Sequence, residues 1–359
     1  MIPYILKRLL LIFPTLLGVL FINFLLVQMT PGGPIEQMIA RTRGMADENF
    51  TSDHPQESTP QADADLYKKY AVGKGLPPEF IRDLEKQYGF DQPFLSRFWK
   101  MMKDYMTFNL GKSYFREVPV SDLIFSKLPT SLTLGFWSIF LIYALSIPLG
   151  IRKALKDGDL FDVASSTILI ILYAIPSFLV GIMFIVFFAG GNYFDWFPLR
   201  GLVSEDWESF SLFHKITDYL WHIVLPISAI VLTGLASITL LTKNSFLDEI
   251  SKQYVVTARS KGLTRKQILY RHIFRNASIP LFAKFPHAFM QIILGSNLLI
   301  EIMFSLDGLG LLGFDAAYNR DYPVMFGSLY LFTLLSLFLH LVGDILYSVL
   351  DPRINFKAQ

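Results

Sequence analysis

Residues 9–27, LLLIFPTLLGVLFINFLLV, form nineteen successive positions without a charged side chain. The hydrocarbon core of a bilayer is about 30 Å thick, and about 20 helical residues are needed to cross it. The run therefore predicts a membrane-spanning helix. Lys7 and Arg8 precede it, so a cleaved signal peptide is the alternative. Because the run is longer than an h-region of about 7–15 residues and no A-x-A-like site follows, we expect a retained anchor.

The composition of the whole chain agrees with a membrane protein. Of its 359 residues, 52% are hydrophobic and only 17% are charged, which is too apolar for an ordinary soluble protein. Hydropathy predicts five further spans, at 132–149, 163–189, 223–241, 285–304 and 327–350. The predicted fold class is an all-α membrane protein with six transmembrane helices. The chain has no cysteine, and its six histidines include no H-E-x-x-H pair, so no metal site is expected.

Lys and Arg residues predict the orientation of the chain, because short cytoplasmic loops carry an excess of them. With the N-terminus inside, the inner segments hold sixteen Lys and Arg residues. The short outer loops hold three, which are Arg200, Lys215 and Arg320. Both termini are therefore expected in the cytoplasm.

The long segment between the first two spans, residues 29–130, is predicted to be a small extracytoplasmic domain. The composition at about 45–78 is typical of a flexible polar insert, and helices are expected at 77–90 and 91–108. The other predicted divisions are an N-terminal anchor at 1–28, a five-helix core at 131–350 that contains a cytoplasmic loop at 243–284, and a cytoplasmic tail at 351–359.

A Gly-Lys-Ser triplet at 111–113 suggests a phosphate-binding loop but lacks the rest of the motif. The first glycine of G-x-x-x-x-G-K-[ST] would fall at position 106, which is Met106. No other nucleotide-binding fingerprint is present in the sequence. We therefore expect no ATP hydrolysis by this chain alone and predict no catalytic residue.

A basic, amphipathic insert, QYVVTARSKGLTRKQILYRHIFRNASIP at 253–280, separates two apolar runs. In its first part Tyr254, Val255 and Ala258 fall on one face of a predicted helix. Gly262 follows where a left-handed C-terminal cap is expected, with Leu263 placed for the accompanying hydrophobic contact. This part is therefore predicted to be a short helix that ends at a glycine.

The second part of the insert begins with Thr264 in a Thr-x-x-Gln capping box, which predicts a second helix. Its apolar stripe is expected at Ile268, Leu269, His272 and Ile273, which leaves the basic side chains for water, lipid or a partner. A helix–turn–helix on the cytoplasmic face follows. It either rests on anionic lipid or docks a soluble partner, and the residues alone do not separate these interpretations.

Several motifs occur together and in order. They are YGFDQP (88–93), YVVTARSKG (254–262), RHIFRNASIP (271–280), LIEIMFSLDGLGLLG (299–313), RDYPVMFG (320–327) and LVGDILYSVLDPRI (341–354). Through them the chain resembles permeases of bacterial ABC importers, in the version found in dipeptide and oligopeptide permeases. RLLLIFPTLLGVLFINFLLVQMTPGGP (8–34), the polar insert after it and GNYFDWFPLRGLVS (191–204) are most similar to a subgroup that imports peptides and microcin C.

The resemblance implies a type I ABC importer permease fold in the bacterial inner membrane. It implies as partners a second homologous permease, one or two ATP-binding-cassette ATPase subunits and a periplasmic peptide-binding protein, with no nucleic acid. ATP and Mg would be bound by the ATPase, and no cofactor by this chain. Residues expected in the ATPase-coupling loop are Tyr254, Thr257, Ala258, Arg259, Gly262, Leu263, Arg271 and Arg275. Gly262 and Ala258 match the family motif, whereas Val256 stands where the family has Glu.

Polar residues within the predicted spans are candidates for the translocation path or for helix–helix hydrogen bonds. They are Asn23, Ser177, Ser237, Gln291, Ser296 and Asn297. The competing function is an ion- or proton-coupled secondary peptide carrier, whose usual mark is an ionisable residue inside the membrane. His340 and Asp344, four residues apart on one helix face, are the candidate pair for it. A helix-end contact of Asp344 is the structural alternative.

Overall fold

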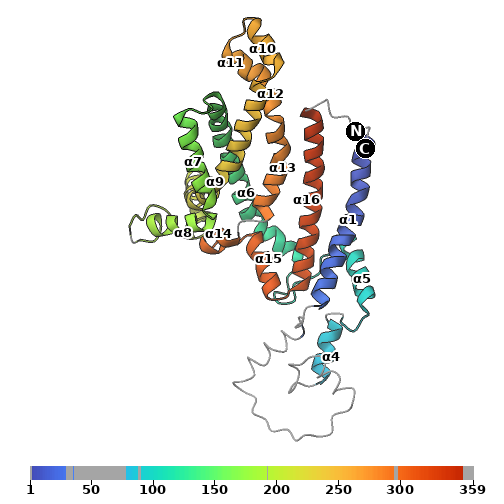
Figure 1. Cartoon of the computed structure of the whole chain (residues 1–359). Coiled ribbons are helices and arrows are strands. Elements are labelled where there is room, and N and C mark those ends of the chain that lie inside the picture. The colour runs from blue at the N-terminus through green and yellow to red at the C-terminus, as the bar shows by residue number, and fades with distance from the viewer. Residues whose placement is uncertain are drawn as a thin grey trace. The chain divides into compact units, whose positions relative to one another are not determined.

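The computed structural model describes residues 2–29, 35, 78–87, 90–191, 193–294 and 298–350. Within these residues the chain forms helices and one isolated β-bridge, but no strand (Figure 1). The helices are α1 (Ile2–Met29), α4 (Pro78–Gln87), α5 (Phe94–Met106), α6 (Val120–Leu155), α7 (Leu160–Ala174), α8 (Ser177–Phe188), the 3-10 turn η1 (Trp207–Ser209), α9 (Leu212–Ile250), α10 (Gln253–Ser260), α11 (Arg265–Gln267), the π-helix η2 (Ile268–Ile273), α12 (Phe274–Ala277), α13 (Ile279–Leu294), α14 (Leu298–Met303), α15 (Leu309–Tyr318) and α16 (Tyr322–Leu350).

Four helices of the described part are long and apolar enough to cross a membrane. They are α1, α6, α9 and α16, and they confirm four of the six predicted spans. Pro14 and Pro148 lie inside continuous helices, in α1 and α6 respectively. α9 has 39 residues. It is therefore about 58 Å long, well beyond the roughly 30 Å hydrocarbon core, so part of it extends outside the bilayer.

The span predicted at 163–189 is formed by two helices and not by one. α7 and α8 meet at an angle of 92°, and each of them packs on α9. Pro176 explains the break, because proline has no backbone N–H and disfavours a helical conformation in the residue before it. Ile175 is accordingly extended, with φ −88° and ψ 123°. The pair is either a broken span or a re-entrant segment.

The span predicted at 285–304 is divided between two helices. α13 ends at Leu294 and α14 begins at Leu298, and residues 295–297 between them lie outside the described residues. Neither helix alone is long enough to be counted as a span. The described residues thus contain four spans, or five if the bent α7–α8 pair is one.

The chain divides into two compact units that do not follow chain order. Unit 1 is Met1–Arg8, Ser126–Leu312 and Leu335–Gln359, and unit 2 is Leu9–Phe125 and Gly313–Leu334. α6 begins in one unit and continues in the other. The helix is therefore continuous across the domain boundary predicted between residues 130 and 131.

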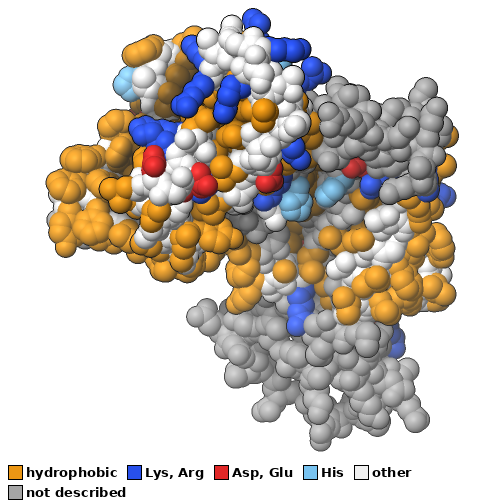
Figure 2. Space-filling view, turned by 45° about the horizontal axis from the view of Figure 1, so that its top comes forward, with side chains coloured by type: hydrophobic (Ala, Val, Ile, Leu, Met, Phe, Trp, Pro, Cys, Tyr) orange, Lys and Arg blue, Asp and Glu red, His pale blue; other side chains and the backbone are white. Residues whose placement is uncertain are grey.

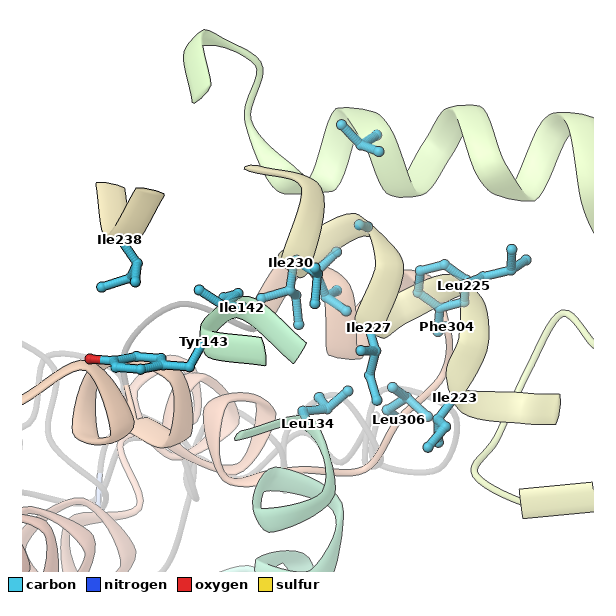
Figure 3. Close-up of a cluster of buried hydrophobic side chains, with 14 of the residues drawn as sticks. Leu134, Ile142, Tyr143, Ile223, Leu225, Ile227, Ile230, Ile238, Phe304 and Leu306 are labelled. Carbon is cyan, nitrogen blue, oxygen red and sulfur yellow. The ribbon is translucent and has the colours of Figure 1, made fainter. Parts of the chain in front are cut away.

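The core of unit 1 is built around α9, which contacts α7, α8, α12 and α13. Its buried apolar side chains include Ile142 of α6, Ile230 of α9 and Phe304, which directly follows α14 (Figure 3). Within this unit α10 and α11 lie at one end of the helix bundle, and α8 and α14 lie at the other (Figure 1). The basic insert thus forms one end of unit 1.

The end of unit 1 away from the insert contains a buried carboxylate. Glu301 is 1% exposed, and its Oε2 accepts a hydrogen bond from the backbone N–H of Leu311 at 2.7 Å. Ser131 Oγ donates to Glu301 Oε1 at 3.4 Å and accepts from the N–H of Leu309 at 2.8 Å. Because the first N–H groups of a helix lack partners within the helix, Glu301 and Ser131 together cap the N-terminus of α15.

Unit 2 contains the two helices predicted for the extracytoplasmic segment, α4 and α5. Aromatic rings of α1, α5 and α16 pack together, with the ring centre of Phe24 5.5 Å from Phe98 and 5.6 Å from Phe326. The Gly-Lys-Ser triplet is used for packing: Ser113 donates a hydrogen bond to the buried Asp321, which also accepts from the N–H of Tyr114.

Candidate functional site

The basic hairpin, residues 253–277, turns at Gly262 as predicted. Gly262 has φ +79°, a left-handed conformation. Its N–H donates to the carbonyl of Arg259 at 3.0 Å, and the N–H of Leu263 donates to that of Ala258 at 3.3 Å. This pair of bonds is the Schellman arrangement, which satisfies carbonyl groups at the end of a helix. The first half of the hairpin is therefore closed by bonds between near neighbours in sequence.

The second half begins with the predicted capping box. Thr264 Oγ1 accepts from the N–H of Gln267 at 3.4 Å, and Gln267 Oε1 accepts from the N–H of Thr264 at 2.9 Å. The two bonds satisfy donors at the start of α11 reciprocally. The turn and the following helix are thus both held by local hydrogen bonds.

The apolar stripe of the second half differs from the predicted one at a single position. Ile268 and Ile273 are buried and Leu269 is half-buried, but His272 is exposed. The reason is the π-helical turn η2, Ile268–Ile273. Residues five apart are rotated by about 140° in an α-helix, whereas the i→i+5 bonding of a π-turn brings them closer to one face. The π-turn therefore buries both isoleucines and leaves His272 outside.

The hairpin is fixed to the ends of α6 and α9 by an apolar cluster. Phe246 of α9 is fully buried and Ala154 of α6 nearly so. They pack with buried side chains of all parts of the hairpin, which are Val255, Ala258, Ile268, Ile273 and Ala277. The hairpin is therefore closely packed on both helix ends.

A polar contact adds to this cluster. Glu249, near the end of α9, accepts a hydrogen bond from the Tyr254 hydroxyl. Asn276 Nδ2 lies 3.5 Å from the same carboxylate. Both halves of the hairpin are therefore connected to one residue of α9.

The eight predicted coupling residues divide into two groups. Tyr254, Ala258 and Leu263 face the apolar cluster and hold the hairpin in place. The exposed members are Thr257, Arg259, Gly262, Arg271 and Arg275. The first group positions the hairpin, and the second is available for contact with another molecule.

The exposed surface of the hairpin is strongly basic. Figure 2, in which this end is turned toward the viewer, shows Lys and Arg side chains gathered in its upper part. The exposed basic residues are Arg259, Lys261, Arg265, Lys266, Arg271 and Arg275. Within the described part of the chain no ion pair is found for any of them. The surface can therefore attract an acidic partner or anionic lipid.

The predicted path residues in the described part of the chain have different surroundings. Asn23 donates to the carbonyl of Val19 in its own helix at 2.8 Å. Ser237 accepts from Lys284 Nζ at 3.2 Å, which joins α9 to α13. Ser177 is half-buried at the start of α8, and Gln291 is exposed.

Ser296 and Asn297 lie outside the described residues. Ser237 thus makes a helix–helix contact, the alternative weighed in the sequence, whereas the bond of Asn23 is internal to α1.

His340 and Asp344, the pair considered for a proton carrier, have different partners. Asp344 Oδ2 lies 3.0 Å from the guanidinium of Arg8. His340 Nδ1 lies 2.7 Å from the carbonyl of Ser336, and its ring centre is 6.1 Å from that of His287. Asp344 makes a contact between two helix ends, as its structural alternative predicts, so the structure does not favour the carrier.

Sequence reasoning missed a buried charge cluster beside the hairpin. Lys153 and Lys243 were counted only as inner-loop charges, yet both contact Asp162 and Lys153 is 0% exposed. Lys153 and the exposed Lys156 stand three residues apart before an Asp-Gly-Asp turn, and the local sequence does not show which of them is buried. The three residues meet only because α6, α7 and α9 pack against one another in the folded protein.

The chain matches the sequence model of one protein family over residues 146–356. The family is described as binding-protein-dependent transport system inner membrane component. The match includes the whole hairpin and its supports on α9.

Curated relatives extend the likeness over the full chain. The chain is 52% identical, over 99% of both proteins, to "Inner membrane ABC transporter permease protein YejB" of Escherichia coli O157:H7. It is 50% identical, again over 99% of both, to "Peptidoglycan transport system permease protein YejB" of Agrobacterium fabrum. It is 29% identical to "Oligopeptide transport system permease protein AppB" of Bacillus subtilis, over 99% of this chain and 100% of the relative.

A solved structure, "Inward facing conformations of the MetNI methionine ABC transporter", matches with a TM-score of 0.48 and 18% identity. The match covers 64% of this chain and 96% of the other.

Proposed function

The chain belongs to the family of binding-protein-dependent transport system inner membrane components, and from this premise we propose that it is the permease subunit of an ABC importer for short peptides. The names of its full-length relatives support the class: they describe ABC transporter, oligopeptide and peptidoglycan transport permeases. The four long apolar helices of the described part agree with a protein of the bacterial inner membrane. The chain is a transporter component and not an enzyme.

The observation that carries the coupling role is the construction of the hairpin. Its inner face is fixed to α6 and α9 by the cluster around Phe246, and its outer face is basic and exposed. A hairpin that only rested on lipid would need neither a fixed turn at Gly262 nor an attachment to Glu249. We therefore favour a docking surface for an ATPase subunit.

The mechanism requires no reactive side chain of this chain. ATP and Mg are bound by the ATPase partners, whose closure would move the docked hairpin. Because the hairpin is packed on the ends of α6 and α9, its displacement would tilt both helices. In a bilayer such whole-helix movement keeps every backbone hydrogen bond intact. The path would then open alternately to the two faces of the membrane.

The remaining partners and the orientation follow from the family. A second permease would complete the path, one or two ATPase subunits would dock the hairpins, and a periplasmic peptide-binding protein would deliver substrate. The hairpin and both termini would lie in the cytoplasm, with α4 and α5 outside, in a chain of six spans. The positive charge of the inner segments supports this orientation.

The substrate class is short peptides, including peptide-like antibiotics such as microcin C. One relative is named for peptidoglycan transport, which adds peptidoglycan to the candidate substrates. Short peptides, peptide-like antibiotics and peptidoglycan all contain peptide bonds. A path that tolerates varied side chains would therefore serve all of them.

The experiment compares cells that carry the chain with cells from which its gene is deleted. Uptake of a labelled tripeptide and sensitivity to microcin C should be lost on deletion and restored by the chain. Uptake should continue when the proton gradient is collapsed while ATP is maintained. Uptake that stops with the gradient alone would instead support a secondary carrier.

A further inference from the structure

A lysine in unit 1 is completely buried beside the hairpin. Lys153 of α6 is 0% exposed, and its Nζ lies 3.0 Å from Oδ1 of Asp162. It also donates to the carbonyl of Asp162 at 2.8 Å, and to the hydroxyls of Ser165 and Ser166 at 2.8 and 2.7 Å. All of these acceptors belong to α7. A buried ammonium group is costly unless it is paired and hydrogen-bonded, and here α7 supplies every partner.

The same aspartate connects α7 to a third helix. Lys243 Nζ of α9 lies 2.7 Å from Asp162 Oδ2 and 2.7 Å from Asp157 Oδ1. Asp157 and Gly158 belong to the turn between α6 and α7, and the N–H of Gly158 donates to Asp162 Oδ2 at 3.2 Å. Asp162 thus joins α6, α7 and α9 at one point, in a group of two lysines and two aspartates that we call the charge cluster.

The helices of the charge cluster are also in close backbone contact. A β-carbon at Gly150 would lie 2.5 Å from Cβ of Thr242 and 2.7 Å from the carbonyl of Thr239. Gly150 is one turn before Lys153, and Thr242 directly precedes Lys243. α6 and α9 therefore cross with no space between them where the charge cluster forms.

The charge cluster and the support of the hairpin occupy the same turns. Ala154 follows Lys153, and Phe246 lies one turn after Lys243. Both of these apolar residues are buried against the hairpin. The hairpin touches α6 and α9 through this apolar cluster, whereas α7 is not part of it. The charge cluster then connects α6 and α9 to α7 through Asp162.

We propose that Lys153, Asp162 and Lys243 are positioning residues that make α7 move with α6, α9 and the hairpin as one body. Movement of the hairpin then reaches the bend between α7 and α8, 92° at Pro176. This inference rests on the proposed function, because it concerns how hairpin movement is passed to the path. Without the charge cluster only packing would join α7 to α9, and we expect α7 to follow α9 less closely during ATP hydrolysis.

Lys243→Met is the informative variant, because it removes only the arm on α9. The buried Asp162 loses one of its two lysines but keeps Lys153 and the N–H of Gly158, so it is not left unpaired. Lys156→Met is the matched control, since Lys156 is an exposed lysine in the turn between α6 and α7. Lys243→Arg, which keeps the positive charge, is the conservative variant.

The first measurement is the number of peptides taken up per ATP hydrolysed by the assembled importer in vesicles. For Lys243→Met we expect a drop of about fivefold with normal ATPase recovery. We expect the parent value for Lys156→Met and near-parent values for Lys243→Arg. An unchanged ratio in Lys243→Met would overturn the proposal, and so would loss of the ATPase from that variant, which would assign Lys243 to docking.

The second measurement does not depend on the substrate. The chain has no cysteine, so spin labels can be placed through Val163→Cys on α7 and Ser251→Cys at the end of α9, both exposed. In the assembled importer the distance between the labels should stay constant when ATP is added, and in Lys243→Met it should change. A changing distance in the parent would overturn the proposal, as would equal behaviour of parent and variant. If the parent takes up no peptide, the proposed function fails, while the label distances still test the rigid body.

Discussion

A β-carbon at Gly308 would lie 2.3 Å from Oε1 of Glu301, so the buried carboxylate occupies the space that a side chain would need. A β-carbon at Gly310 would lie 3.0 Å from Oε2 of the same carboxylate. The approach brings Glu301 to the N-terminus of α15, where it accepts the N–H of Leu311. The glycines of the 299–313 motif therefore have a packing reason, which is access of one carboxylate to backbone donors.

Gly308→Ala should destabilise this end of unit 1. The added methyl group must displace Glu301 or the start of α15, and overpacking of this kind costs about 1–3 kcal/mol. Thermal unfolding of the purified chain should shift to lower temperature. Gly313→Ala is the control, because a β-carbon there meets nothing within 4 Å. Equal unfolding temperatures for both variants would contradict the close approach.

Glu301→Leu should cost more than Glu301→Gln. Leucine leaves the N–H of Leu311 without an acceptor in a buried site, and loss of a helix cap costs about 0.5–2 kcal/mol. Glutamine keeps one oxygen that can accept this bond. The measurement is chemical unfolding of the two variants in the same detergent. If the two lose the same stability, the capping role of Glu301 is wrong.

Gly262→Val should separate folding from transport. With φ +79° the residue is in a region that costs an ordinary L-residue roughly 1–2 kcal/mol and a β-branched one more. Apart from its neighbours in the chain, no residue has an atom within 4 Å of a β-carbon at this position, so the expected effect is backbone strain. Steady-state abundance should change little, whereas peptide uptake and co-purification of the ATPase should fall.

Gly262→Asn is the matched control for this change, because asparagine tolerates the left-handed conformation better than valine. It should retain more uptake and more ATPase than Gly262→Val. Normal uptake with normal ATPase recovery in Gly262→Val would end the docking interpretation.

Arg265→Glu should distinguish a protein partner from lipid. Arg265 is exposed at the start of α11, where a carboxylate is favourable to the helix, so the fold should tolerate it. Lipid attraction is worth about 1 kcal/mol per basic residue and is diffuse, so membrane retention should not change. ATPase recovery should drop if the hairpin docks the ATPase. Recovery equal to that of the parent would favour a surface that rests on lipid.

Cysteine labelling should test the orientation. Ser204 is a poor position, because its hydroxyl donates to Asp218 Oδ1 at 2.6 Å and its N–H donates to the same carboxylate. Glu205→Cys, at an exposed neighbour, should react with an impermeant thiol reagent in intact spheroplasts. Lys266→Cys should react only after the membrane is opened. The reverse pattern would exclude an N-terminus inside the cell.

The sequence predicted the hairpin in detail because its structure is local. The turn at Gly262 and the box of Thr264 and Gln267 depend on bonds between residues at most five apart. Such bonds are readable from spacing alone. The one error, His272, came from a π-turn, and nothing in the local pattern announced the change of helical repeat.

Long apolar runs also determined four spans, because the cost of burying charge in lipid is a property of composition. Family membership likewise followed from motifs in the order of the chain. The 92° bend at Pro176 did not follow. A proline permits a kink, but the angle depends on where α7 and α8 each pack on α9.

Tertiary structure alone decided the charge cluster and the Glu301 cap. Lys243 is 81 residues from Asp162, and Ser131 is 170 residues from Glu301. An exposed lysine and a lysine that is buried between helices look the same in sequence. The difference between them is the desolvation of a charge, and that depends on which distant groups arrive to surround it.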